Sequence, residues 1–175
     1  TAHDMATVAR ELPGCVAAIT RNAGLNAAAM QAADSLLVIA NHGVGTNEID
    51  LKQAAELGIP TIFTPTANAR SVAEHAMALT LALARKVIPA DAAVRGLRWS
   101  LRYEARMMEL HGKTMGLVGF GTIGRLTGAM ARNGFGMKLL VFSPNVSDSI
   151  LVEAGAERAP TLESLLERAD VVSLH

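Results

Sequence analysis

Three glycines at a fixed spacing are the strongest chemical signal in the sequence. Gly119, Gly121 and Gly124 form the pattern Gly-x-Gly-x-x-Gly. Gly119 ends the apolar run Thr114–Gly119, and the helical pattern Ile123–Asn133 begins beside Gly124. A strand that enters this pattern and a helix that leaves it form the phosphate-binding turn of dinucleotide-binding domains. Gly119 permits the tight turn, Gly121 lets a diphosphate approach the backbone, and Gly124 allows close helix–strand contact. The pattern predicts a site for NAD or NADP.

The helix that follows the glycines supplies the groups that would hold the phosphates. Thr122 and Ile123 lie in its first turn and, with Gly124, present free backbone N–H groups. These groups attract anions, and the helix dipole assists them. A glycine-rich turn without a ligand is the alternative, but the flanking strand and helix favour the phosphate site.

The residue after the next strand bears on the choice of cofactor. That strand is predicted at Lys138–Phe142, and Ser143 follows it. NAD-specific sites usually carry Asp or Glu at this place, where the carboxylate binds the adenosine ribose. Ser143 does not repel a 2′-phosphate as a carboxylate would, and no Arg stands immediately beside it to grip one. The sequence leaves NAD and NADP open.

A second glycine pair follows an earlier predicted strand. Leu36–Ala40 precedes Gly43, Val44 and Gly45, and no third glycine completes the pattern. A second nucleotide site is therefore not expected. The N–H groups of Val44 and Gly45 could still hold a small anion, such as a substrate carboxylate.

Composition and charge exclude several classes of function. Among 175 residues, 16 basic residues balance 16 acidic ones, so no net field favours nucleic acid or an anionic membrane. The apolar run Ala76–Ala84 is too short to cross a bilayer, and no secretion signal opens the chain. The single cysteine, Cys15, suits a reducing compartment and is expected to be a small buried side chain. We expect a cytoplasmic protein that binds no membrane, nucleic acid or metal ion.

Apolar runs alternate with helical patterns throughout the chain. Continuous apolar runs indicate parallel strands that are covered on both faces, and strand–helix alternation predicts doubly wound α/β sheets. The predicted strands are Cys15–Ile19, Leu36–Ala40, Thr61–Phe63, Thr114–Gly119, Lys138–Phe142 and Val171–Leu174; the predicted helices are Asn26–Ala33, Glu48–Leu57, Ser71–Val87, Ile123–Asn133 and Leu162–Arg168.

The predicted helix Ser71–Val87 separates two α/β units. We place the boundary at the start of this helix, which gives units of residues 1–67 and 68–175. The helix carries apolar residues on more than one face, so we expect it to be enclosed on several sides. Pro89–Gly112 lacks a clear period and is predicted to be a surface connection. Its basic and aromatic residues match no nucleic-acid-binding module, so a solvated linker is the favoured interpretation.

Five stretches occur in the order of a known family, and the resemblance runs over almost the whole chain. Together they resemble the D-isomer-specific 2-hydroxyacid dehydrogenases, which include phosphoglycerate dehydrogenase, glyoxylate/hydroxypyruvate reductase and formate dehydrogenase. The resemblance implies two Rossmann-like or flavodoxin-like parallel-sheet domains, both incomplete in this chain: a substrate-binding domain and an NAD(P)-binding domain. The stretches are His42–Asp50, Ala54–Pro60, Asn68–His75, Leu110–Gly124 and Ala169–His175.

The resemblance also implies roles for single residues. Val44 and Gly45 would offer backbone groups to the substrate carboxylate, and Asn68 would be the active-site asparagine at the domain hinge. Val72 would pack near the nicotinamide, and Leu174 and His175 would approach the segment that passes the adenosine.

The same resemblance implies an activity and an assembly. Thr122 and Ile123 match the residues that contact the pyrophosphate. The implied reaction is hydride exchange between NAD(P) and a small 2-keto or 2-hydroxy acid, and the implied assembly is a homodimer around the 71–87 helix.

The sequence also departs from the family pattern. Asn41 stands where many members have Arg, and Ser143 stands where NAD users have Asp. The family's catalytic Arg, its carboxylate partner and its His come later in the chain, so we expect them beyond His175 and expect this chain alone to be inactive. None of the five histidines, His3 included, is assigned as a base. The alternative is a non-catalytic, dinucleotide-responsive interaction module, as in the C-terminal-binding protein corepressors.

Overall fold

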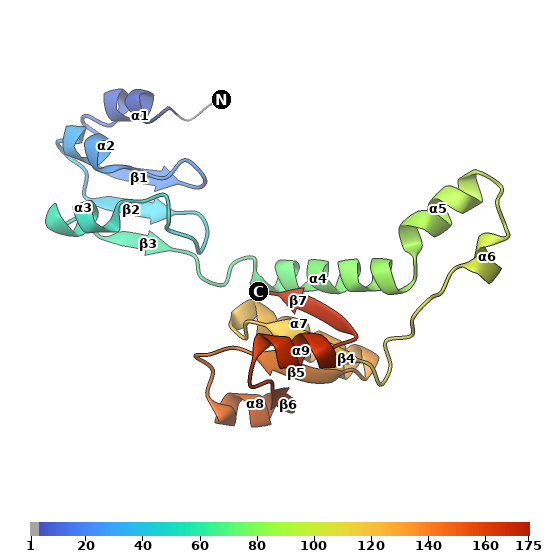
Figure 1. Cartoon of the computed structure of the whole chain (residues 1–175). Helices are drawn as coiled ribbons and strands as arrows, with labels where there is room; N and C mark the ends of the chain where they lie inside the picture. The colour runs from blue at the N-terminus through green and yellow to red at the C-terminus, as the bar shows by residue number, and fades with distance from the viewer. Residues whose placement is uncertain (1–3) are drawn as a thin grey trace. The chain divides into compact units, whose positions relative to one another are not determined.

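The computed structural model describes residues 4–175 and divides into two compact α/β units (Figure 1). Unit 1 ends at Asn68, and unit 2 runs from Ala69 to His175. Each unit has its own parallel sheet, which confirms the predicted α/β class with parallel strands. None of the helices within residues 4–175 has the length and hydropathy to cross a membrane.

The described residues of unit 1 form a three-stranded sheet with β2 in the centre. Asp4, Asn26 and Asp50 cap the three helices, because each side chain accepts a backbone N–H of the first turn. The strands are β1 (Ala17–Thr20), β2 (Val38–Asn41) and β3 (Thr61–Phe63); the helices are α1 (Met5–Glu11), α2 (Ala27–Ala32) and α3 (Leu51–Glu56).

The apolar core of unit 1 lies on one face of its sheet. Met30 of α2 and Ile39 of β2 are fully buried there. On the opposite face, Ile19, Ala40 and Ile62 are paired in register across the three strands, and Ile19 is 82% exposed. The prediction of cover on both faces is therefore wrong for unit 1, since its described helices pack on one side only.

Unit 2 has a four-stranded sheet of order β6–β5–β4–β7. Because β4 lies between β5 and β7, the glycine turn at its carboxyl end is flanked by the ends of two parallel neighbours. The strands are β4 (Thr114–Val118), β5 (Lys138–Phe142), β6 (Ala156–Arg158) and β7 (Val171–Leu174); the helices are α4 (Ala69–Ala84), α5 (Val87–Arg95), α6 (Leu101–Glu104), α7 (Thr122–Phe135), α8 (Asp148–Ala154) and α9 (Leu162–Arg168).

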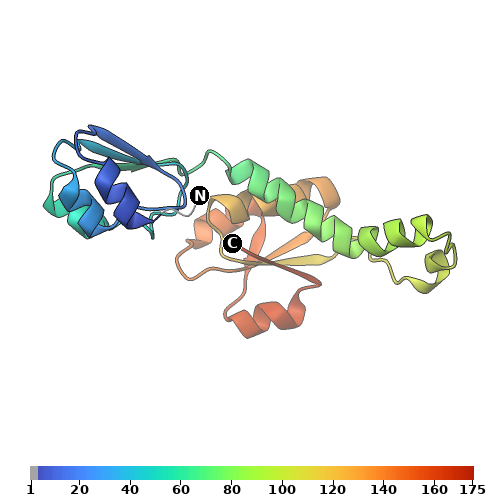
Figure 2. The same cartoon turned by 90° about the horizontal axis from the view of Figure 1, so that it is seen from above.

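The sheet of unit 2 is covered on both faces, as its continuous apolar runs predict. Met115 and Leu117 of β4 join a core with residues of α4 and α7, and both are fully buried. On the other face, Leu140 of β5 packs with Leu165 of α9. Figure 2 shows α4, in green, and α9, in red, on opposite sides of the sheet.

The long helix α4 buries only one of its apolar faces within the described chain. Ala73 and Met77 point into the core, whereas Leu79 and Leu83 are 52% and 71% exposed. The prediction that this helix is enclosed on several sides is wrong within the described chain. The helix also ends earlier than predicted, and Lys86 takes a left-handed conformation with φ 54° between α4 and α5.

Several short elements escaped the sequence analysis. The helices α1 and α8, with 7 residues each, and the strand β6, with 3, were not predicted. The predicted surface connection Pro89–Gly112 in fact contains most of α5 and all of α6, and these helices project from the rest of unit 2 (Figure 1). Trp99 and Tyr103 of this segment are 60% and 78% exposed, so no buried stripe marked its helices.

Gly116 provides a test of the packing between β4 and α9. A Cβ at this position would lie 2.6 Å from Cδ2 of Leu165 and 2.8 Å from Cβ of Ala169. We expect Gly116→Ala to lower the free energy of unfolding by about 1–3 kcal/mol, measured by urea denaturation. In the control Gly134→Ala, the new methyl group meets nothing within 4 Å, and we expect a gain of about 0.5–1 kcal/mol from helix propensity. An unchanged unfolding midpoint for Gly116→Ala would contradict the packing.

Candidate functional site

The β4–α7 turn brings backbone atoms of separate segments into direct contact. Gly119 has φ 95°, and a Cβ there would lie 2.4 Å from the carbonyl oxygen of His175. A Cβ at Gly124 would lie 2.6 Å from the carbonyl oxygen of Gly119. The shape of the turn itself therefore requires glycine at both positions.

Gly121 differs from its two neighbours because it faces open space. Its φ of −73° suits any residue, and a Cβ there would meet nothing within 4 Å. No side chain of residues 4–175 caps α7, whose first turn contains the exposed Thr122 and the half-buried Ile123. The open approach and the uncapped helix N-terminus together fit a diphosphate.

The turn after β5 lies beside the glycine turn. The N–H of Gly119 donates to the carbonyl oxygen of Phe142 at 2.9 Å, and half-buried Ser143 follows directly. Arg158 of β6 donates to the carbonyl oxygens of Ser143 and Val146, at 3.3 Å and 2.6 Å. The sequence analysis considered only basic residues adjacent to Ser143 and missed Arg158. Recognition of the strand β6, which pairs with β5, would have placed Arg158 beside the end of β5.

His175 and Val72 occupy different surroundings within unit 2. The N–H of His175 donates to Val118 at 2.9 Å, and its Cδ2 would lie 3.5 Å from a Cβ at Gly124. Burial lowers the pKa of the His175 imidazole, so the ring is neutral at pH 7. Val72 lies near the start of α4, with 38% exposure. The structure thus places His175 at the glycine turn.

In unit 1, Asn41 shapes the loop that follows β2. Its side chain is buried, and Nδ2 donates to the carbonyl oxygens of Gly45 at 2.7 Å and Gly43 at 3.3 Å. The N–H of Gly43 donates to Oγ1 of Thr64 at 3.0 Å, which ties the loop to the end of β3. Asn41, a departure from the family pattern, therefore has a structural role in this loop.

A cavity of about 340 Å³ opens beside this loop. Gly45 and Asn68 line it, together with Arg21 and Asn22, whereas Val44 is 56% exposed and does not. The sequence analysis missed Arg21 and Asn22. Both follow the carboxyl end of β1, and the ends of parallel strands meet at one edge of a sheet, so the strand pattern could have found them. A cation and backbone groups at such an edge suit an anion.

The histidines gain no catalytic assignment. His42 borders the cavity beside Gly45, and His111 packs against Gly136. His3 lies outside the described residues.

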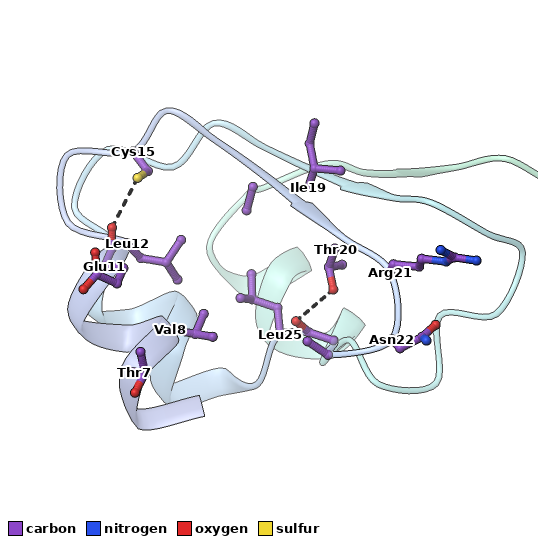
Figure 3. Close-up of a pocket in the computed structure, with 13 residues that line it drawn as sticks. Thr7, Val8, Glu11, Leu12, Cys15, Ile19, Thr20, Arg21, Asn22 and Leu25 are labelled. Atoms are coloured by element: carbon purple, nitrogen blue, oxygen red, sulfur yellow. Dashed lines mark hydrogen bonds between the residues drawn. The ribbon is translucent and has the colours of Figure 1, made fainter. Parts of the chain in front are cut away.

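A larger cavity of about 520 Å³ lies among α1, β1 and the loop after β1 (Figure 3). Leu12 and Leu25 form apolar walls, and Cys15 is half-buried rather than fully buried as predicted, with its Sγ donating to the carbonyl oxygen of Glu11 at 3.4 Å. Figure 3 shows Glu11 and Arg21 at opposite ends of the cavity. We do not consider it a candidate active site.

Comparison with known proteins identifies the family. The family model described as D-isomer specific 2-hydroxyacid dehydrogenase, NAD binding domain, matches residues 77–175, which is more than half of the chain. The chain belongs to this family. The resemblance inferred from the sequence motifs is thereby confirmed.

Individual relatives agree with this placement. A glyoxylate reductase from Korarchaeum cryptofilum is 38% identical over 154 residues, which cover 86% of this chain and 46% of the reductase. A dehydrogenase structure from Rhizobium meliloti has a TM-score of 0.82 at 30% identity and covers 100% of this chain and 60% of its own. The D-lactate dehydrogenase from Aquifex aeolicus, complexed with NAD and lactic acid, has a TM-score of 0.84 at 31% identity, covering 95% of this chain and 50% of its own. The chain spans less than two thirds of each.

Because Gly121 faces open space, a side chain at this position should affect cofactor binding without affecting folding. We expect Gly121→Val to fold normally and to lose at least about tenfold in affinity for NADH, because the new side chain fills the approach to the helix N-terminus. NADH fluorescence titration measures the affinity, and thermal denaturation checks the fold. Gly134→Ala serves as the control and should bind as the natural protein does. Undiminished binding by the Gly121 variant would contradict the assignment of this turn.

Proposed function

We propose that this chain contributes the dinucleotide-binding part of an oxidoreductase that acts on 2-hydroxy acids. The observation that carries the proposal is the unobstructed approach to Gly121 and the uncapped start of α7, in a chain of this dehydrogenase family. The bound nicotinamide supplies or accepts the hydride, and C2 of a 2-keto or 2-hydroxy acid is its partner.

The proposed cofactor residues surround the carboxyl end of β4. The N–H groups of Thr122, Ile123 and Gly124 hold the pyrophosphate, and the lack of a side chain at Gly121 leaves room for it. Ser143 and His175 flank the adenosine, and Val72 packs near the nicotinamide. Residues 68–175 are thus assigned to the NAD(P)-binding domain.

Residues 1–67 are proposed to belong to the substrate-binding domain. The backbone of Val44 and Gly45 would receive the substrate carboxylate, and the amide of Asn68 would orient the substrate. Arg21, at the same cavity, adds a positive charge that favours an acidic substrate. No proton-transferring residue is assigned to this chain.

Turnover tests the proposed activity. We expect the full-length protein to oxidise NADH or NADPH when it is given glyoxylate or hydroxypyruvate, measured by the loss of absorbance at ~340 nm. Asn68→Ala should lower kcat/KM by about tenfold or more, because the substrate loses a hydrogen-bonding partner. If the protein binds the dinucleotide but reduces none of a panel of 2-keto acids, the non-catalytic interaction module becomes the better assignment.

We further infer a cytoplasmic homodimer built around α4. Large apolar side chains are exposed along α4, including Leu79 and Leu83, and Val87 at the start of α5 is also exposed. A second copy of the chain would bury this apolar surface.

The dimer can be tested by changing the exposed face of α4. We expect Leu83→Glu to give a monomer in analytical ultracentrifugation, since it would bury an unpaired carboxylate in the interface. Val152→Glu on α8 is the matched control, because Val152 is 78% exposed outside α4, and it should leave the assembly unchanged. A dimer that persists in Leu83→Glu at micromolar concentration would place the interface elsewhere.

A further inference from the structure

Arg158 joins β6 to the turn between β5 and α8. Its backbone pairs with Val141 in the parallel register of the two strands, so its side chain starts one residue below the end of β5. The guanidinium donates to the carbonyl oxygens of Ser143 and Val146 and to Oδ1 of Asp148, the last at 2.8 Å. Arg158 therefore holds both ends of the turn 143–148 at once.

The ion pair with Asp148 changes the charge of this turn. Asp148 opens α8, is 83% exposed in its side chain, and is the one carboxylate in the segment 143–148. Arg158 is only 35% exposed in its side chain, so its charge is less well hydrated and acts on its neighbours more strongly. The pair leaves the turn without an uncompensated negative charge.

The turn 143–148 follows β5, and this position determines which part of a bound cofactor its charge would act on. In a dinucleotide-binding sheet, the residue after the strand that follows the glycine turn meets the adenosine ribose. A carboxylate at that residue binds the ribose hydroxyls and repels a 2′-phosphate. Here the residue is Ser143, whose hydroxyl carries no charge, and the guanidinium lies 3.3 Å from its carbonyl oxygen.

We propose that Arg158 is a specificity-determining residue that makes the turn after β5 a site for the 2′-phosphate of NADP(H). It does so by fixing the turn through two carbonyl oxygens and by offsetting the charge of Asp148. The proposal rests on the proposed dinucleotide-binding function and goes beyond it, because it selects the phosphorylated cofactor.

The adenosine end can be tested alone with two small probes. We expect 2′,5′-ADP to bind the full-length protein about tenfold more tightly than 5′-AMP in isothermal titration calorimetry, and NADPH to bind more tightly than NADH. Binding of 5′-AMP with no gain from the 2′-phosphate would overturn the proposal and leave the dinucleotide site intact. Failure of both probes and of NADH to bind would instead refute the proposed function.

Variants of Arg158 and Asp148 test whether the cofactor preference depends on the charge of this ion pair or only on the stability of the fold. Arg158→Leu should abolish the preference for 2′,5′-ADP and leave 5′-AMP affinity within about twofold, because the carboxylate of Asp148 then faces the phosphate alone. Addition of Asp148→Asn to the Arg158→Leu variant should restore part of the preference for 2′,5′-ADP. The single variant Arg158→Lys should keep part of this preference. An equal loss of affinity for both probes in Arg158→Leu would show that Arg158 acts only on the fold, contrary to the proposal.

The pair Arg168–Glu157 supplies the matched control. It joins α9 to β6 through an arginine, at 2.7 Å, and within residues 4–175 neither partner hydrogen-bonds to the turn 143–148. Arg168→Leu should leave the preference for 2′,5′-ADP unchanged, since exposed ion pairs contribute little to stability. A loss of preference in this variant as large as in Arg158→Leu would mean that the effect is not specific to the turn.

Discussion

Close approach of backbone atoms at the carboxyl end of β4 is the constraint on which unit 2 depends. The chain at Gly119 turns against the carbonyl oxygen of His175, and α7 begins against Gly119 itself, where any side chain would collide. This contact fixes where α7 starts and where β7 ends relative to β4. The same arrangement leaves the first amide groups of α7 facing outward, so the fold of the turn and its capacity for an anion have one cause.

The glycine turn could be recognised from sequence because its evidence is local. The strand, the three glycines and the helix form one continuous stretch from Thr114 to Phe135, and each glycine is required by a contact or a space found in the structure. The two-sided cover of the unit 2 sheet was predictable for a similar reason, since Leu139, Leu140 and Val141 alternate between two cores that both need apolar side chains.

Other parts depend on pairings that a single sequence does not display. Arg158 reaches Ser143 only because the three-residue strand β6 lies beside β5, and Arg21 and Gly45 line one cavity only because β1 lies beside β2. The burial of α4 was misjudged because both of its faces are apolar, and small residues such as Ala73 permit the closer packing. Periodicity shows that a helix has an apolar face, but it does not show which of two such faces meets the core.

The sheet face of unit 1 that no described helix covers has a consequence during synthesis. Unit 1 leaves the ribosome before unit 2, and it carries the row Ile19, Ala40 and Ile62 in contact with water. A nascent polypeptide with such a surface is open to capture by chaperones and to coalescence with its own copies. The yield of soluble protein in a recombinant host should therefore depend strongly on growth temperature and on the supply of chaperones.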